Sequence, residues 1–155
     1  MMPARVRRAD VADAETVGGL LSDFNDEFAS PTPDAATFAR RFRELLSRPD
    51  LFALLAETED APVGLAIATL RPTPYSDGPL AQLEELYVRP ALRGGGIGTA
   101  LLTAVIRIVR EHGAEELHIG VDEVDVDARR FYERHGFRNR EPGEDSRMLL
   151  YFREF

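Results

Sequence analysis

The chain has 155 residues, of which 44% are hydrophobic and 30% are charged, and this composition suits a single domain, residues 1–155, with an apolar core. Cysteine is absent, which excludes disulfides, thiolate metal ligands and a cysteine nucleophile. The formal net charge of −8 argues against a surface that binds nucleic acid and favours cationic partners through long-range attraction.

Lysine is also absent, because all 19 basic residues are arginine. A Walker-type phosphate loop needs a lysine after its last glycine, so that class of nucleotide site is excluded. No apolar run approaches the roughly 18 residues of a membrane helix, and the N-terminal segment lacks the apolar centre of a signal peptide. We therefore expect a cytoplasmic protein without membrane partners.

The N-terminal half predicts a strand, two helices and a β-hairpin. A weakly alternating run at 4–9 predicts the first strand, and apolar residues at helical spacing predict both helices. These residues are Val17, Leu20, Leu21, Phe24 and Phe28 in the first helix and Phe38, Phe42, Leu45 and Leu46 in the second. Two prolines mark the start of the second helix, where Thr32 or Ser30 is the expected cap. Apolar runs at 51–57 and 62–70, with a turn between them, predict the hairpin.

The C-terminal half continues with alternating strands and helices. Residues 80–88 predict a strand, and a helical stripe begins at Ile97 and ends before Gly113. A strand at 116–121, a short helix ended by Gly136 and a last strand at 146–155 complete the order. This order predicts a mixed α/β sheet flanked by helices.

A glycine-rich loop, Arg93 to Gly98, joins the strand at 80–88 to the long helix. A helix N-terminus exposes unpaired N–H groups with a partial positive charge, so it stabilises an anion, and glycines let that anion approach closely. The dinucleotide fingerprint G-x-G-x-x-G fails, because its third glycine position is Thr99. A tight turn without any ligand is the alternative interpretation.

The loop fits the pattern R/Q-x-x-G-x-G/A and resembles the coenzyme A loop of the GNAT acetyltransferases. The resemblance extends over residues 80–137 and includes the run FYERHGF in the short helix. It implies the acyl-CoA N-acyltransferase fold, a mixed, mostly antiparallel sheet flanked by helices, with a bulged fourth strand that splays from the fifth. It also implies an acetyl-CoA co-substrate, an amine acceptor, direct attack in a ternary complex, no metal, and a homodimer as in many relatives.

The same resemblance assigns residues to the coenzyme. Backbone groups of the fourth strand would pair with the pantetheine arm, and one N–H there would contact the thioester carbonyl. The pyrophosphate would lie on the glycine loop, with Arg93 assisting by charge. Asp125 stands where many members have asparagine, and Ala128 matches the small residue beside the arm. The assigned positions are Leu86, Tyr87, Val88, Arg93, Gly94, Gly95, Gly96, Ile97, Gly98, Thr99, Asp125, Ala128 and Tyr132.

Tyr132 matches the tyrosine that protonates the coenzyme A thiolate in the family, and a phenol that is protonated at neutral pH suits this role. The alternative is a core aromatic beside Phe131. The resemblance to the polyamine N-acetyltransferases makes Glu84 the expected general base, whereas other members carry the glutamate two residues earlier, where this chain has Gln82. By strand alternation Glu84 shares a face with Leu86, while Glu85 points the other way. Glu85 as the base, or a solvated surface without catalytic function, are both open alternatives.

The remaining charged residues predict no metal site, but four carboxylates are candidates for attracting the acceptor. The three histidines have no partners at metal-ligand spacing, and residues 122–127 do not match a calcium loop. The carboxylates of Asp23, Asp26, Glu27 and Asp34 would attract a cationic acceptor if they line the acceptor side. Two rival functions stay open: a non-catalytic acyl-CoA-binding sensor or regulatory module, and an acyltransferase with another acyl donor or acceptor.

Overall fold

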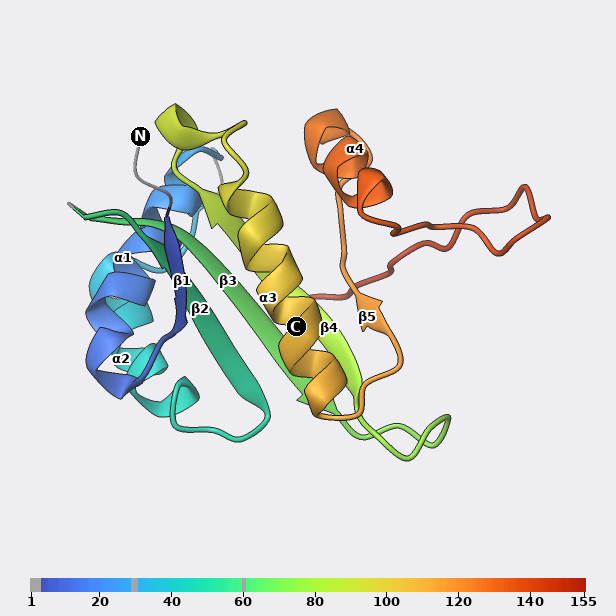
Figure 1. Cartoon of the computed structure of the whole chain (residues 1–155), viewed down its shortest axis with the longest axis horizontal. Coiled ribbons are helices and arrows are strands. Elements are labelled where there is room, and N and C mark those ends of the chain that lie inside the picture. The colour runs from blue at the N-terminus through green and yellow to red at the C-terminus, as the bar shows by residue number, and fades with distance from the viewer. Residues whose placement is uncertain (1–3, 29–30, 60) are drawn as a thin grey trace. The chain divides into compact units, whose positions relative to one another are not determined.

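The computed structural model describes residues 4–28, 31–59 and 61–155. The chain divides into two compact units, Met1–His118 and Ile119–Phe155. Among the described residues, the first unit holds the sheet with α1 (Ala14–Asp26), α2 (Ala35–Leu45) and α3 (Ile97–Glu111), and the second holds α4 (Val126–Arg134). Figure 1 labels these elements. The expectation of one domain over residues 1–155 stays a prediction.

A five-stranded sheet forms the centre of the first unit. Its strands are β1 (Arg5–Arg8), β2 (Leu51–Glu57), β3 (Pro62–Arg71), β4 (Leu80–Val88) and β5 (Leu117–His118). They lie in the order β1-β2-β3-β4-β5, antiparallel at every pair except the parallel pair of β4 and β5. The predicted mixed, mostly antiparallel sheet is therefore confirmed.

Helices cover both faces of this sheet. In Figure 1, α3 (Ile97–Glu111) lies across the near face, and α1 (Ala14–Asp26) and α2 (Ala35–Leu45) cover the other. Short 3-10 turns, Val11–Asp13 and Pro90–Leu92, precede α1 and follow β4.

Burial on both faces explains why the central strands are almost continuously apolar. Along β2, Ala53 and Leu55 face the cluster under α1 and α2, and the alternate residues Leu54 and Ala56 face α3. All four are at most 2% exposed. Burial of a leucine side chain stabilises the folded state by roughly 2 kcal/mol, so Leu54 and Leu55 of β2 help to hold the first unit together.

The fourth strand carries a bulge at Glu84. Ile67 of β3 pairs with Glu85 and Ala68 pairs with Leu83, which leaves Glu84 as the extra residue. The bulge reverses the alternation of β4, because Leu83 now faces α3 while Glu85 faces α1 and α2. The bulged fourth strand that the family resemblance implied is confirmed.

Pairing between β4 and β5 is limited to the first part of β4. Ala81 pairs with Leu117 and Gln82 pairs with His118, and no register beyond these two positions joins the strands in the described residues. The stretch from Leu83 to Val88 therefore has a β3 partner on one edge only. This short contact agrees with the expected splaying of the two strands.

The caps of the helices differ partly from expectation. The side chain of Asp34 accepts a hydrogen bond from the Thr37 amide at 2.8 Å and caps α2, so the prediction of Thr32 was wrong. A carboxylate is a stronger acceptor beside a helix N-terminus than a hydroxyl. Ser30, the other candidate, lies outside the described residues. Gly113 adopts φ +87° after the end of α3, as predicted.

The second unit contains α4 (Val126–Arg134). Asp125 caps it by accepting a hydrogen bond from the Ala128 amide at 3.1 Å, and Gly136, at φ +89°, follows its end. The rings of Phe131 and Phe137 pack edge-on against Tyr132, with centroids 5.2 and 5.5 Å away. The short helix and its glycine stop are confirmed.

Two predicted strands differ from the structure. The strand expected at 116–121 is confined to β5, and residues 146–155 form no strand. Their alternating apolar pattern predicted a strand, but a strand also needs a partner for its backbone hydrogen bonds. The large apolar side chains of this segment are exposed, from Met148 at 57% to Phe155 at the C-terminus.

Candidate active site

The glycine loop opens α3 in a conformation that requires glycine. Gly94 and Gly96 have φ values of +80° and +90°, which L side chains rarely adopt. A Cβ at either position would meet no atom within 4 Å, so the space above the loop is open. Both glycines are therefore required by their backbone conformation and not by contacts with other residues, and they leave room for a ligand to approach the backbone.

The N-terminus of α3 lacks the side-chain cap that α2 and α4 possess. Gly96 is its N-cap and provides no side-chain cap, and no acidic residue lies in its first turn. The amides of a first helical turn have no carbonyl four residues earlier in the helix. With 15 residues of aligned peptide dipoles behind it, this end of α3 is suited to bind an anion.

The predicted coenzyme positions on β4 lie directly before this loop. Leu86, Tyr87 and Val88 pair with Ala66, Leu65 and Gly64 of β3. Their other edge faces away from β3, on the side where β5 pairs only with the start of β4. An extended ligand can add to such a strand edge through backbone hydrogen bonds.

The bulge brings both glutamates to the acceptor face, which we define as the face of β4 turned toward α1 and α2. The carboxylate of Glu84 is exposed and accepts a hydrogen bond from the Thr69 hydroxyl at 2.6 Å. Thr69 pairs with Leu51 of the cluster under α1 and α2, so Glu84 does not share the face of Leu86. That expectation was wrong because alternation fails at a bulge.

Glu85 is the carboxyl group with the more unusual environment. It is partly buried, and burial together with the negative charge of Glu84 raises its pKa from 4.5 to about 7. Desolvation is the larger of the two causes. A carboxyl with a pKa near neutrality exchanges protons readily at physiological pH, which suits a general base.

The side chain of Arg93 turns toward α1. Its guanidinium donates to both carboxylate oxygens of Glu27 at 2.8 Å and to the Val88 carbonyl at 2.9 Å. The predicted assistance of Arg93 to a pyrophosphate stays a prediction, and Glu27 competes with the anion for its charge. The guanidinium also lies 5.8 Å from the centre of the Tyr87 ring.

Three of the four carboxylates predicted to attract a cation have partners in the structure, and the fourth, Asp26, is exposed. Asp23 pairs with Arg89 at 2.8 Å, Glu27 pairs with Arg93, and Asp34 caps α2. The sequence did not predict Arg89 or Thr69 as site residues. Arg89 pairs with Asp23, which lies far away in the sequence on α1, and Thr69 donates to Glu84 at the bulge. Both belong to the candidate site as partners of carboxylates.

The remaining predicted residues lie in the second unit. Asp125 and Ala128 form the first turn of α4, and Tyr132 follows one turn later, 8% exposed among aromatic rings. The burial of Tyr132 is compatible with a general acid and also with a core aromatic residue, the two roles predicted for it. The carboxylate of Asp125 is engaged as a helix cap.

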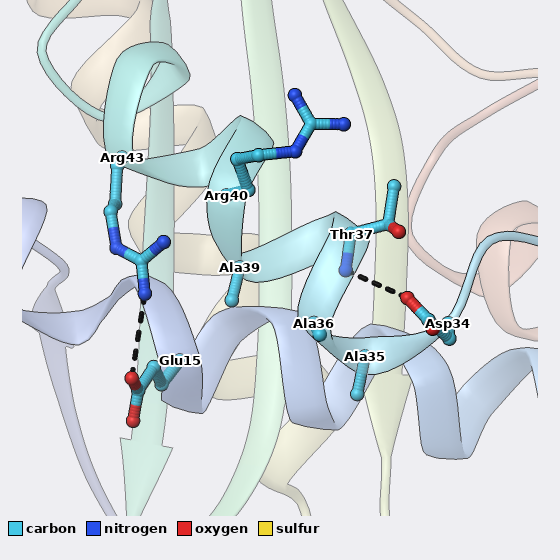
Figure 2. Close-up of a pocket in the computed structure, with 8 residues that line it drawn as sticks. All are labelled: Glu15, Asp34, Ala35, Ala36, Thr37, Ala39, Arg40 and Arg43. Carbon is cyan, nitrogen blue, oxygen red and sulfur yellow. Dashed lines mark hydrogen bonds and ion pairs between the residues drawn. The ribbon is translucent and has the colours of Figure 1, made fainter.

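A separate hollow of about 570 Å³ lies at the start of α2 (Figure 2). Asp34 there faces the Thr37 amide, and Glu15 pairs with Arg43 at 3.4 Å. The hollow is lined by Glu15, Asp34, Ala35, Ala36, Thr37, Ala39, Arg40 and Arg43. It includes Asp34, one of the carboxylates predicted to attract the acceptor, but no residue assigned to the coenzyme or to proton transfer.

Across the described part of the chain, no three histidine, aspartate or glutamate side chains gather closely enough to hold a metal ion. Within residues 4–28, 31–59 and 61–155, no helix combines the length and the apolar character that crossing a bilayer demands.

The fold and the loop together define a class of protein. A mostly antiparallel sheet with a bulged β4, followed by a glycine loop that opens α3, is the arrangement that the acetyltransferase resemblance implied. The family model for the acetyltransferase (GNAT) family matches residues 18–137. The chain belongs to the GNAT family.

Known proteins agree with this membership. A Mycobacterium bovis protein named as an uncharacterized N-acetyltransferase is 30% identical over 105 residues, which cover 68% of this chain and 64% of that protein. An Arthrobacter sp. FB24 crystal structure assigned as an acetyltransferase is 48% identical, with a TM-score of 0.90, over 97% of this chain and 96% of that chain. The aminoglycoside N-acetyltransferase AAC(6')-Iy in complex with CoA shares the fold at 21% identity and a TM-score of 0.78, covering 97% and 94%.

Proposed function

We propose that this protein is an N-acetyltransferase that moves an acetyl group from acetyl-CoA to an amine by direct attack in a ternary complex. The observation that carries the proposal is the N-terminus of α3, opened by Gly94 and Gly96 without a side-chain cap at the N-cap position, directly after the half-paired strand β4. Family membership supports the same reaction class.

The residues at α3 fit the chemistry of a coenzyme A pyrophosphate. Gly94 and Gly96 leave space above a loop whose backbone N–H groups and helix dipole favour a doubly charged anion. The backbone edge of Leu86, Tyr87 and Val88 would hold the pantetheine arm, and one N–H of this edge would polarise the thioester carbonyl. A single preorganised donor of this kind contributes roughly 3 kcal/mol to an acyl-transfer transition state.

Glu85 is the general base that we propose, with Glu84 tuning it. A base must be deprotonated to act and basic enough to accept the amine proton, and a pKa of about 7 satisfies both conditions near neutral pH. Glu84 is exposed and hydrogen-bonded to Thr69, and its charge contributes to the raised pKa of Glu85.

Tyr132 is the general acid that we propose. Acetyl-CoA supplies an activated thioester carbon; the amine nitrogen forms the new N–C bond as the C–S bond breaks. A protonated amine first loses one proton to water. Glu85 takes the second proton, which the nitrogen loses as the amide forms, and the Tyr132 hydroxyl gives its proton to the departing thiolate. Because the chain has no cysteine, a cysteine acyl-enzyme is not an alternative to this direct transfer.

The acceptor belongs to the broad class of amines, either in a small molecule such as a polyamine, aminoglycoside or amino acid, or in a protein. A protonated amine would be attracted to the carboxylates of Glu84 and Glu85 on the acceptor face. The homodimer and the cytoplasmic location stay predictions.

A thiol-release assay tests the proposal. The purified chain would be mixed with acetyl-CoA and one amine each from a polyamine, an aminoglycoside, an amino acid and a peptide with a free N-terminus. Released coenzyme A is read with a thiol reagent, and the cysteine-free chain adds no background. We expect turnover with at least one amine, and its absence with all four while acetyl-CoA binds would favour a non-catalytic binding module.

The acid assignment has its own variant pair. Tyr132→Phe should bind acetyl-CoA normally and lose turnover by about 10²-fold or more, because removal of a general acid has effects of this size. Tyr75→Phe is the matched control, since Tyr75 is 93% exposed on the connection between β3 and β4. Equal turnover of the two variants would contradict the acid role of Tyr132.

A further inference from the structure

Two ion pairs tie the C-terminal end of α1 to the end of β4. Arg89 Nη1 lies 2.8 Å from Asp23 Oδ2, and Arg93 Nη2 lies 2.8 Å from both carboxylate oxygens of Glu27. The arginines follow β4 along the chain, and the two acidic residues lie 66 positions earlier. The pairs therefore join segments that are remote in sequence.

Each guanidinium is also anchored to the sheet side. The Nε of Arg93 donates to the Val88 carbonyl at 2.9 Å, and the Nε of Arg89 donates to the Pro62 carbonyl at 3.3 Å. A guanidinium held at two points is preorganised and loses less side-chain freedom per contact. The ion pairs are partly exposed, and exposed pairs of this kind contribute little to global stability. The two ion pairs therefore fix the position of the end of α1 and contribute little to the free energy of unfolding.

What the pairs position is an aromatic cluster beside the proposed base. Phe24 stacks on Tyr87 with ring centroids 4.9 Å apart, and Phe28 packs edge-on against Phe24 at 5.5 Å. Tyr87 is buried and shares the acceptor face with Glu85, two residues earlier on β4. The last turns of α1 therefore form a wall next to Glu85.

This wall presents aromatic rings, and two of its three carboxylates, those of Asp23 and Glu27, are paired. The carboxylates of Asp23 and Glu27 point into the two guanidinium groups, while Phe28 is 51% exposed. A paired carboxylate attracts a cation much less than a free one, because the two charges cancel at a distance. The wall thus offers an apolar surface to an amine that approaches Glu85.

We propose that Arg89 and Arg93 are positioning residues that hold the end of α1 as the acceptor wall, and that Arg93 does this in place of binding the coenzyme pyrophosphate. The inference rests on the proposed function, because it takes the amine to approach Glu85 from the acceptor face. It favours acceptors that carry their amine on an apolar or aromatic body over polycations.

The experiment separates coenzyme binding from acceptor binding. Acetyl-CoA affinity would be measured by titration calorimetry, and KM and kcat for benzylamine and spermidine by thiol release, in Arg93→Gln, Glu27→Gln and the charge exchange Arg93→Glu with Glu27→Arg. Arg107→Gln is the matched control, because Arg107 forms an exposed pair with Glu111 on α3, at 3.3 Å.

We expect both single variants to keep the acetyl-CoA Kd within about twofold, a difference of roughly 0.4 kcal/mol. The KM for benzylamine should rise roughly tenfold, with a smaller change in kcat, because a displaced wall weakens acceptor binding in ground and transition states alike. Arg93→Gln should also lower the KM for spermidine, since Glu27 is then unpaired. The charge exchange should restore the wild-type KM for benzylamine.

A loss of acetyl-CoA affinity of tenfold or more in Arg93→Gln, with Glu27→Gln unchanged, would overturn the proposal and assign Arg93 to the pyrophosphate. The rate of amide hydrogen exchange at residues 23–28 measures how firmly the end of α1 is held, and this measurement needs no acceptor. If the wild type acetylates no amine, the proposed function fails, and faster exchange in both single variants still supports the wall. Unchanged exchange in both would overturn it independently.

Discussion

Replacing Glu85 with glutamine tests the raised pKa that makes this residue the proposed base. Burial and the charge of Glu84 raise the pKa of Glu85 from 4.5 to about 7 in the folded protein. The folded state therefore holds a proton that the unfolded chain has lost between these values, and the stability of the wild type falls as the pH rises through this window. Since each unit of pKa corresponds to about 1.4 kcal/mol, the penalty above pH 7 is about 3 kcal/mol at most.

Glutamine has nearly the shape of protonated glutamate and carries no charge at any pH. The free energy of unfolding of Glu85→Gln minus that of the wild type should be near zero below about pH 4.5, rise through the window, and level off near 3 kcal/mol above about pH 7. Urea unfolding at several pH values measures this difference directly. At the same time, turnover should fall by about 10²-fold or more, because glutamine cannot accept a proton.

Glu84→Gln is the matched control on the same bulge. It removes the smaller cause of the shift, so it should lower the pKa of Glu85 and move the midpoint of the pH–rate profile toward lower pH. It should keep most of the activity, since Glu84 is exposed. A stability difference between Glu85→Gln and wild type that stays flat from about pH 5 to pH 8 would refute the reasoning, as would full activity of Glu85→Gln.

Three further substitutions test the fold and the loop. Gly96→Ala should destabilise the protein by about 1–2 kcal/mol, because alanine is strained at φ +90°, and should weaken acetyl-CoA binding in calorimetry; an unchanged Tm and Kd would contradict this. Gly78→Ala should cost at least about 2 kcal/mol, because its Cβ would lie 2.1 Å from the Gly113 carbonyl oxygen, and a wild-type Tm would contradict the close contact. Leu55→Ala should cost about 3 kcal/mol in urea unfolding, because Leu55 is fully buried in β2, and a loss below about 1 kcal/mol would argue against that packing.

Much of the first unit could be predicted from the sequence because local patterns determine it. The apolar runs of β2 and β3, the stripe of α3 and the glycine that follows α3 depend on residues close in the chain, as does the glycine that follows α4 in the second unit. The glycine loop was also found from a local pattern, the spacing of its glycines. In the structure, Gly94 and Gly96 of this loop have positive φ.

Apart from the cap of α2, where Asp34 replaces the nearby Thr32, the errors come from partners that are distant in the sequence. The bulge at Glu84 arises from the register of β4 against β3, and alternation alone placed Glu84 on the wrong face. The carboxylates of Asp23 and Glu27 seemed available to a cation until the structure paired them with Arg89 and Arg93. The pattern at 146–155 predicted a strand, but no local signal reveals whether a strand has a neighbour.

Titration calorimetry of the folded wild-type chain with acetyl-CoA, and separately with NAD and ATP, tests the central claim most directly. The account predicts saturable binding of acetyl-CoA with one site per chain, weakened in Gly96→Ala, and no comparable binding of NAD or ATP. A folded chain that does not bind acetyl-CoA, or an affinity that Gly96→Ala leaves unchanged, would contradict the assignment of the α3 N-terminus to the coenzyme.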